Sequence, residues 1–437
     1  MRTWVPDRED EPRQGPGQDA RIFADCEVSR HAGVCTGCSC LCDDISFYLK
    51  EGKIHGALNI CETGWRRLRC LRSDAPATAS PPVSSDAPVE QAARLLSSHR
   101  PTLVLGADGL DEAAIRVSRE LAVALDGAWL PWPYPEARRF YDRVTRFGWA
   151  TALLDEVRDQ ADLVIFWRAD PLETHHRHLS RYSLFAHGRY TERGKHDRNL
   201  AAVASHRMRL EPLCQQYFQV PPERDAALIE ALMFPRPGGD FDQRDFQPLR
   251  RALQGASYIA LFVDPGQTDD AALDGLFRWS ATLNGTVSKR HVILPIWRAG
   301  ANIEGFRQVS LEYEATPWGK EGSGTGDAAN ETRHDWESIA ARVRSVLVIA
   351  PDQVDSAHLG LPDCLREMPR VVLDPFEEAR GVEGQVWLPT ALPGVESGGV
   401  FYRADGLCLE VDSLEARSPR GRPAAERLLR EILYRIA

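Results

Sequence analysis

The sequence predicts an α/β protein with a small cysteine-rich module near its N-terminal end. Three observations lead to this prediction. Short apolar runs of strand length alternate with amphipathic segments of helix length along most of the chain, and such alternation is typical of parallel sheets covered by helices on both faces. Seven of the ten cysteines lie between positions 26 and 70. The chain has 437 residues, which is enough for several domains with their own cores.

The elements follow in chain order. In the cysteine module, Asp43–Leu49 predicts a strand by its alternating apolar positions, and a turn follows at 50–53. Further strands are expected at Pro101–Gly106, Ala161–Trp167, Asn199–Ser205, Ser257–Val263, His291–Pro295, Arg344–Ile349 and Pro369–Asp374. Helices are expected at Val89–Ser98, Asp111–Leu125, Ala226–Met233 and 423–436. The glycine-rich, charged segment 317–333 predicts a surface loop.

These elements predict five segments along the chain. They are a disordered tail (1–25), a four-cysteine module with a linker (26–88), a first α/β domain (89–215), a second α/β domain (216–343), and a return to the first α/β domain that ends in a C-terminal helix (344–437).

Composition narrows the function classes. The net charge of −10 disfavours a general nucleic-acid binder, which would carry a basic excess. No apolar run is long enough for a membrane span, and the first twenty residues lack the apolar stretch of a signal peptide. We therefore expect a cytoplasmic protein without membrane contact. In that reducing compartment, clustered thiols indicate metal or redox chemistry more often than disulfides.

Four cysteines have the spacing of a metal or iron–sulfur site. Two residues separate Cys35 from Cys38, three separate Cys38 from Cys42, and eighteen separate Cys42 from Cys61. Four thiolates in this pattern suit a [4Fe-4S] cluster. Four thiolates also suit structural zinc, and a remnant that binds nothing is the third alternative. Cys40, inside the loop, either substitutes for one of the four or stays free.

Four stretches of the sequence resemble the B subunit of formylmethanofuran dehydrogenase, a member of the molybdopterin oxidoreductase family. They are Cys35–Ile45 with Cys61, the segment Trp167–Ser183, the glycine turn Gly300–Phe306, and the segment Val386–Gly406. Their order and spacing carry the resemblance together. It implies a molybdopterin-oxidoreductase-like fold, similar to domains 1–3 of formate dehydrogenases and DMSO reductase, in which Cys35, Cys38, Cys42 and Cys61 hold a [4Fe-4S] cluster.

The sequence departs from this family where the redox metal should bind. The dehydrogenases hold molybdenum or tungsten with a cysteine or selenocysteine followed by a histidine, and the resemblance places that pair between residues 127 and 148. That stretch contains neither residue type. No cysteine occurs between Cys70 and Cys214, and no histidine between His99 and His175. Glu136 lies near the ligand position, so carboxylate ligation is disfavoured without being excluded. The alternative for Glu136 is an exposed acid paired with Arg138 or Arg139.

A second departure concerns the electron path. In formate dehydrogenases a lysine shortly after the fourth cysteine links cluster and pterin, whereas here Glu62-Thr63-Gly64-Trp65 follows Cys61. An electron path to a pterin is therefore not expected, and neither is bound molybdopterin.

The close spacing of three histidines is compatible with a metal site. His175, His176 and His178 alternate with Arg177, and Arg181 follows. The arginines raise the local positive charge and oppose a divalent ion. The favoured interpretation is a basic lobe, extended by Arg189, Arg193 and Lys195, that once faced pterin phosphates or now faces an anionic carrier, and a solvated surface loop is the alternative.

These features predict a structural B subunit of a formyltransferase/hydrolase complex in methanofuran- and tetrahydromethanopterin-linked one-carbon metabolism. The resemblance implies that the other subunits of that complex carry out the transfer and hydrolysis, so no residue of this chain is expected to be catalytic. The first alternative is an active molybdenum or tungsten dehydrogenase subunit. The second is an electron-transfer or zinc-stabilised binding module.

Overall fold

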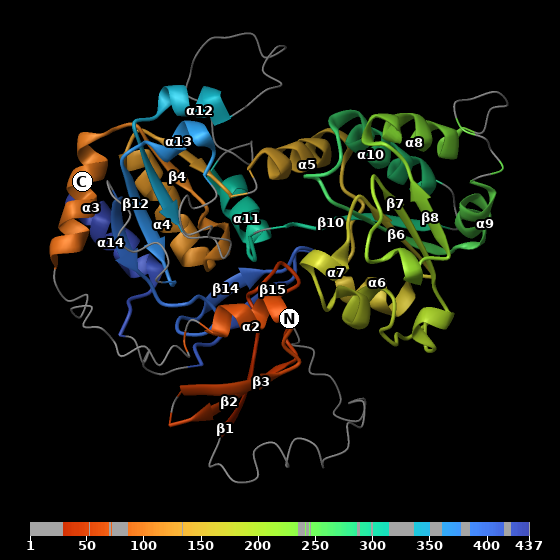
Figure 1. Ribbon diagram of the computed structural model, residues 1–437, viewed down its shortest axis with the longest axis horizontal. Helices are drawn as coiled ribbons and strands as arrows, with labels where there is room; N and C mark the ends of the chain where they lie inside the picture. The colour runs from red at the N-terminus through yellow and green to blue at the C-terminus, as the bar shows by residue number, and fades with distance from the viewer. Residues whose placement is uncertain are drawn as a thin grey trace.

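The computed structural model contains two parallel β-sheets in separate lobes, with a small antiparallel sheet beside their junction (Figure 1). It describes residues 29–51, 53–69, 71, 86–132, 134–234, 241, 244, 246–285, 289–298, 300–313, 336–349, 361–376, 385–414 and 421–436. The expected tail at 1–25, the loop at 317–333 and most of the linker at 73–88 lie outside these residues. None of the described helices has the length and apolar character needed to cross a membrane.

The first lobe is built on a five-stranded parallel sheet with the order β13-β12-β11-β4-β5. Its strands are β4 (Thr102–Leu105), β5 (Ala128–Leu130), β11 (Ser345–Ile349), β12 (Arg370–Asp374) and β13 (Gln385–Pro389). The helices of this part of the chain are α3 (Asp86–Ser98), α4 (Glu112–Ala124), α11 (Ile303–Tyr313), α12 (Trp336–Arg342), α13 (Asp363–Arg366) and α14 (Ala425–Ile436). Separate apolar clusters cover the two faces of the sheet, which explains why its strands are apolar throughout.

The second lobe has the strand order β10-β9-β6-β7-β8, again all parallel. Its strands are β6 (Leu163–Trp167), β7 (Asn199–Ala204), β8 (Gln216–Gln219), β9 (Tyr258–Val263) and β10 (Arg290–Pro295). Its helices are α5 (Tyr134–Phe147), α6 (Leu154–Gln160), α7 (Pro171–Thr174), α8 (Asp225–Met233), α9 (Gln247–Gly255) and α10 (Asp270–Asn284). Helix α5 leads from the first sheet to this lobe (Figure 1).

The mixed α/β class with parallel sheets is as predicted, but the strands are grouped differently from the expectation. The strand at 102–105 was expected in one domain with those at 163–167 and 199–204. It instead pairs with β11, while β6 and β7 join β9 and β10 in the other sheet. All of these strands are equally apolar and buried on both faces. Their local pattern therefore contains no information about which sheet they join.

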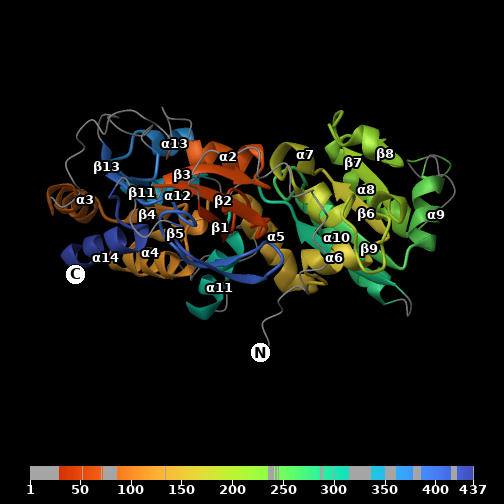
Figure 2. The same ribbon diagram turned by 90° about the horizontal axis from the view of Figure 1, so that it is seen from below.

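The cysteine module is an antiparallel sheet of β1 (Ser29–Gly33), β2 (Ile45–Lys50) and β3 (Lys53–Leu58), followed by α2 (Glu62–Arg69). It lies against the junction of the two lobes, near the two-stranded ribbon of β14 (Gly399–Tyr402) and β15 (Cys408–Val411) (Figure 2). Phe47 and the buried cysteines pack in one apolar cluster with Phe166 of β6. The module is therefore part of the core of the second lobe.

Candidate metal centre

The loop that follows β1 brings the N-terminal cysteines together. The backbone N–H of Cys35 donates to the carbonyl oxygen of Cys42 at 2.8 Å and closes the loop. Within it, the N–H of Leu41 donates to Cys38 O at 3.1 Å, and Leu41 has a positive φ of 39°. This tight turn directs the side chains of a short segment inward, as the pattern of Cys35, Cys38 and Cys42 predicted.

Helix α2 brings Cys61 to the loop. Cys61 precedes the helix, and its carbonyl oxygen accepts from the N–H of Trp65 at 2.8 Å. Gly64 lies directly against the loop, because a Cβ at this position would be 2.6 Å from Cys35 Sγ. The absence of a side chain at Gly64 thus allows helix and loop to approach closely.

The four predicted cysteines and Cys40 line one pocket, together with His175, His176, Arg177, Ile45 and Asn59. Cys35, Cys40 and Cys42 are buried, and Cys38 and Cys61 are partly buried. Sequence reasoning had left Cys40 undecided and had placed His175 in a basic lobe. The structure brings both into the pocket.

Three of the thiols in this pocket, those of Cys35, Cys38 and Cys42, favour their neutral form. Burial, assisted by the neighbouring Cys38, raises the pKa of Cys35 to about 12. A hydrogen bond with Cys40 and burial raise the pKa of Cys38, and burial followed by the charges of Cys38 and Cys35 raises that of Cys42. Sulfur atoms close together in an apolar site repel one another as thiolates, and a bound cation would reverse this preference.

His175 is nearly inaccessible to solvent, with 2% of its surface exposed. Its Nε2 is 3.1 Å from Ser39 Oγ, and its Nδ1 is 2.9 Å from Thr174 Oγ1. Burial and the neighbouring His176 lower its pKa to about 4. His178 does not reach the pocket: it is buried among Phe166, Tyr182 and Phe262, and burial lowers its pKa to about 3. The histidine cluster is thus divided between pocket and core.

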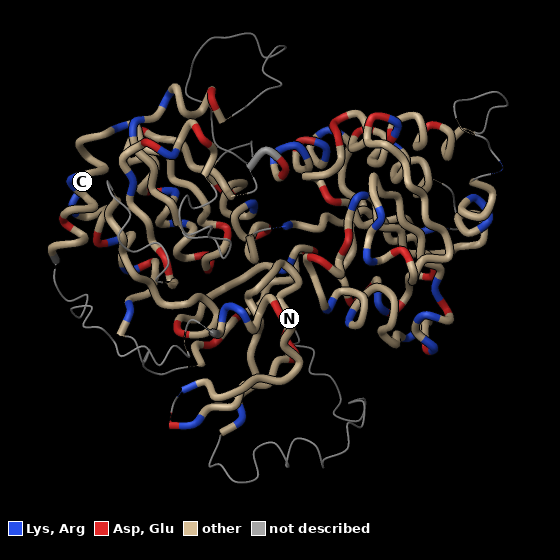
Figure 3. Tube along the Cα trace, viewed as in Figure 1, with Lys and Arg blue, Asp and Glu red and all other residues tan. Residues whose placement is uncertain are grey.

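Two arginines of this segment are already paired with acids. Arg177 donates to both carboxylate oxygens of Asp44 at 2.5 and 2.6 Å, and Arg181 forms ion pairs with Asp43 and Asp44. Arg193 likewise pairs with Asp197 at 2.5 Å. Basic and acidic residues are mixed over both lobes (Figure 3). The arginines next to the pocket therefore anchor the cysteine loop instead of presenting free donors to an anionic carrier.

The resemblance places a redox metal near residues 127–148, and this stretch contains large aromatic residues but no cysteine or histidine. Trp129 in β5 is buried, stacks on Phe306 with ring centroids 3.7 Å apart, and donates from Nε1 to Ser118 Oγ at 2.8 Å. The N–H of Trp132 donates to Asp108 Oδ1 at 2.6 Å. This stretch between β5 and α5 serves packing, and it offers no thiolate or imidazole to a soft metal.

Glu136 lies in the first turn of α5 and is partly buried. Its Cγ is so close to Gly266 that a Cβ built there would be 3.2 Å away. The arginines that were expected to pair with it bind elsewhere: Arg138 contacts Asp142 at 3.7 Å, and Arg139 donates to Pro265 O at 2.6 Å. A single carboxylate, with no cysteine or histidine in the same stretch, does not supply the protein thiolate by which the dehydrogenases hold molybdenum or tungsten.

Comparison with known proteins connects this fold and site to a class. No family model matches the chain. It is 23% identical over 431 residues to the B subunit of the tungsten-containing formylmethanofuran dehydrogenase 2 of Methanococcus maripaludis, covering 92% of this chain and 98% of that protein. It is 24% identical over 408 residues to the protein of the same name from Methanocaldococcus jannaschii, covering 86% and 92%. The chain is thus similar to formylmethanofuran dehydrogenase B subunits over most of its length.

A solved structure shows a similar fold. It is the formyltransferase/hydrolase complex (FhcABCD) from Methylorubrum extorquens in complex with methylofuran, with a TM-score of 0.61 and 19% identity. The match covers 80% of this chain and 95% of the solved one. The resemblance predicted from the four sequence stretches is confirmed.

Proposed function

We propose that this chain is the B subunit of a formyltransferase/hydrolase complex that takes part in methanofuran- and tetrahydromethanopterin-linked one-carbon metabolism, in which formaldehyde is oxidised to formate. Its role there is structural: it supplies a folded scaffold and interfaces for the other subunits, in the cytoplasm. Similarity over most of its length to the B subunits of formylmethanofuran dehydrogenases and the fold shared with a chain of such a complex support this proposal. A molybdopterin-oxidoreductase arrangement of domains is part of it.

One observation carries the structural role. From β5 to the first turn of α5, where the resemblance places the metal of a dehydrogenase, this chain has Trp129, which stacks on Phe306, Trp132, whose N–H donates to Asp108, and the carboxylate of Glu136. Without a soft ligand, a redox step on molybdenum or tungsten is not supported at this position. Formyl transfer and hydrolysis would then occur on other subunits.

If this chain held the [4Fe-4S] cluster that the resemblance implies, the pocket of Cys35, Cys38, Cys42 and Cys61 would be its place. These cysteines fit such a group to the extent that all four line one pocket and have the required soft donors. Their four sulfur atoms, all of them described, do not form a group within 4.8 Å of one another. A zinc tetrahedron would need thiolates about 3.8 Å apart, so zinc on all four cysteines fits this arrangement less well.

The complex itself provides the test. The chain would be co-expressed with its neighbouring subunits, and the purified complex analysed for molybdenum and tungsten and assayed both for formyl transfer with hydrolysis and for dye reduction with formylmethanofuran. We expect transfer and formate release, with neither metal present in stoichiometric amount. Stoichiometric tungsten or molybdenum together with dye reduction would instead establish the active dehydrogenase alternative.

A further inference from the structure

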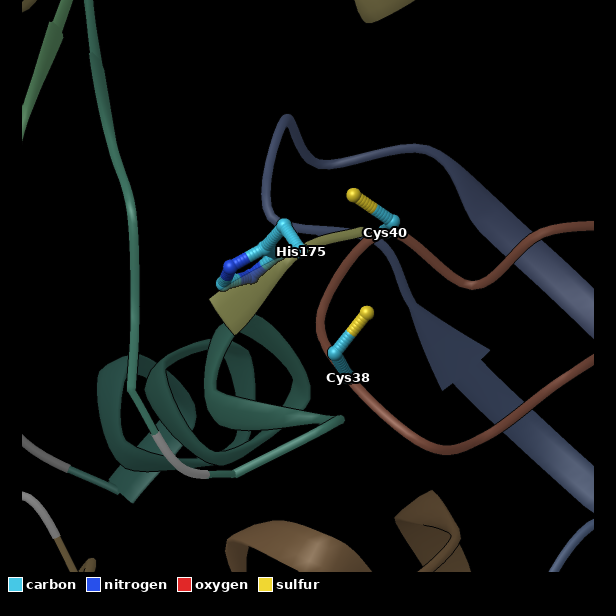
Figure 4. A group of neighbouring side chains, drawn as sticks. All are labelled: Cys38, Cys40 and His175. Atoms are coloured by element: carbon cyan, nitrogen blue, oxygen red, sulfur yellow. The ribbon is translucent and has the colours of Figure 1, made fainter. Parts of the chain in front are cut away.

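Within the described residues, Cys38, Cys40 and His175 are the one group of three histidine, cysteine or acidic side chains close enough to share a metal ion. Their donor atoms all lie within 4.8 Å of one another (Figure 4). Two of them come from the cysteine loop and the third from the end of α7, so the tertiary structure brings them together. This group shares only Cys38 with the four-cysteine set.

The distances suit a zinc ion after a small adjustment. Zinc binds thiolate sulfur at about 2.3 Å and imidazole nitrogen at about 2.0 Å in a tetrahedron, which places two donors about 3.5 Å apart. The three side chains therefore need to close by roughly 1 Å. Cys38 and Cys40 lie two residues apart in the cysteine loop, and their sulfur atoms are already within 4.8 Å of each other. Two thiolates and one imidazole are soft and borderline donors, which favour zinc over magnesium or calcium.

The imidazole is oriented for ligation through Nε2. The Thr174 hydroxyl, 2.9 Å from Nδ1, can accept a hydrogen bond from Nδ1–H, which leaves the lone pair on Nε2, the ring nitrogen 3.1 Å from Ser39 Oγ. Metal-bound histidines usually have such a partner on the second ring nitrogen. The loop is held as well, because Ser39 O accepts from the N–H of Ala404 at 3.0 Å.

The surrounding charges do not oppose a divalent ion. Arg177 and Arg181, which flank the pocket, are paired with Asp43 and Asp44. A zinc ion with two thiolates and one neutral imidazole carries no net charge, so it can lie among side chains as buried as Cys40 and His175.

We propose that Cys38, Cys40 and His175 bind one zinc ion, whose fourth position faces the pocket lined by Cys35, Cys42 and Cys61 and is taken by water. Binding releases the two thiol protons to solvent, and no electron is transferred. The ion connects the cysteine loop to the end of α7 and so stabilises the contact between the N-terminal module and the second lobe. This inference is independent of the proposed scaffold role, and it excludes a four-cysteine cluster because both need Cys38.

The test uses the full-length chain under anaerobic reducing conditions, with Co²⁺ as the optical probe for zinc. We expect one equivalent of Co²⁺ to produce sulfur-to-cobalt charge-transfer absorption, and one equivalent of Zn²⁺ to displace it. Cys40→Ser and His175→Gln should weaken binding by about 10-fold or more, since each removes one ligand. His175→Cys should restore binding with stronger charge-transfer absorption.

Matched controls distinguish the proposed ligands, Cys38, Cys40 and His175, from the four-cysteine set. Cys61→Ser and His176→Gln alter pocket residues outside the proposed group and should leave Co²⁺ affinity within about 2-fold of the wild type. Thermal unfolding in chelator confirms that each variant folds cooperatively. The proposal is overturned if the wild type binds no Co²⁺, or if Cys61→Ser abolishes binding while Cys40→Ser retains it. An iron-bearing, brown chain whose iron survives His175→Gln would equally overturn it.

Discussion

The cysteine pocket and the stretch from β5 to α5 differ in whether they offer soft metal ligands. The resemblance to formylmethanofuran dehydrogenases implies an iron–sulfur cluster in the first region and a redox metal in the second. Here five cysteines and His175 line the pocket, whereas the stretch from β5 to α5 contains Trp129, which stacks on Phe306, and the carboxylate of Glu136. Soft metal ligands can thus line one region of a fold while packed aromatic side chains fill another region of the same fold.

The largest expected effect tests whether the stretch from β5 to α5 serves packing. Trp129→Ala removes a fully packed indole and its hydrogen bond to Ser118, and should lower the free energy of unfolding by about 3–5 kcal/mol. Trp129→Phe keeps an aromatic ring over Phe306 and should cost about 1 kcal/mol. Denaturant unfolding measures both. A near-neutral Trp129→Ala would mean that the aromatic residues are retained for a ligand.

Gly64→Ala tests the close approach within the pocket. The added methyl group would meet Cys35 Sγ at 2.6 Å and Ile60 at 2.7 Å, so helix α2 must move away from the loop. We expect a loss of about 2 kcal/mol in unfolding free energy and weaker Co²⁺ binding. Gly255→Ala is the control, because beyond its chain neighbours and its own helix no atom lies within 4 Å of the added carbon. Equal stability of the two variants would contradict the packing described here.

The pocket should also make stability depend on pH through His175. Its pKa is about 4 in the folded chain and 6.5 in the reference state, so the unfolded chain binds more protons between these values. Stability is therefore complete above about pH 6.5 and falls as the pH drops toward 4, by about 1.4 kcal/mol per pH unit for this group. Between about pH 4 and 6.5, His175→Gln should reduce the slope of unfolding free energy against pH by about 1.4 kcal/mol per pH unit, which corresponds to the uptake of one proton on unfolding. An unchanged slope would show that His175 is solvated.

The smallest effect concerns the ion pairs beside the pocket. Asp44→Asn removes the carboxylate that accepts two hydrogen bonds from Arg177. Because both side chains are partly exposed, we expect a loss of only about 1 kcal/mol, decreasing with added salt. Asp197→Asn, which disrupts the distant pair with the exposed Arg193, is the control. A salt-independent loss of several kcal/mol would indicate that Asp44 is effectively buried.

Sequence reasoning was accurate where a local pattern determines the outcome. The strands β4, β6, β7, β9, β11 and β12 and the helices α3, α4, α8 and α14 lie where apolar periodicity predicted them, within a few residues. Asp111 caps α4 by accepting from the N–H of Ala114 at 3.2 Å, in keeping with the acidic helix start. The α2 and α5 helices and the cysteine module's outer strands β1 and β3 were not anticipated, although the apolar residues Ala137, Phe140, Tyr141, Val144 and Phe147 give α5 a regular helical face.

The site was predictable only in part for a similar reason. Cys35, Cys38 and Cys42 are neighbours in sequence, so their spacing alone indicates a shared loop. No local sequence pattern connects Cys40 to His175. Arg177 between the histidines and Arg181 after them suggested positive charges without acidic partners. That charge is neutralised by Asp43 and Asp44, which follow the cysteine motif directly. The acidic pair after Cys42 was the one sequence signal that could have indicated this contact.

The sequence by itself determined the α/β class, the soft donors of the N-terminal loop and the lack of any cysteine or histidine where a redox metal would bind. These properties depend on residue identity and on periodicity over a few turns or strands. Only the tertiary structure decided which sheet each strand joins and that His175 meets Cys38 and Cys40. Such contacts form between distant segments whose local patterns are interchangeable, and the packing of the whole chain selects among them.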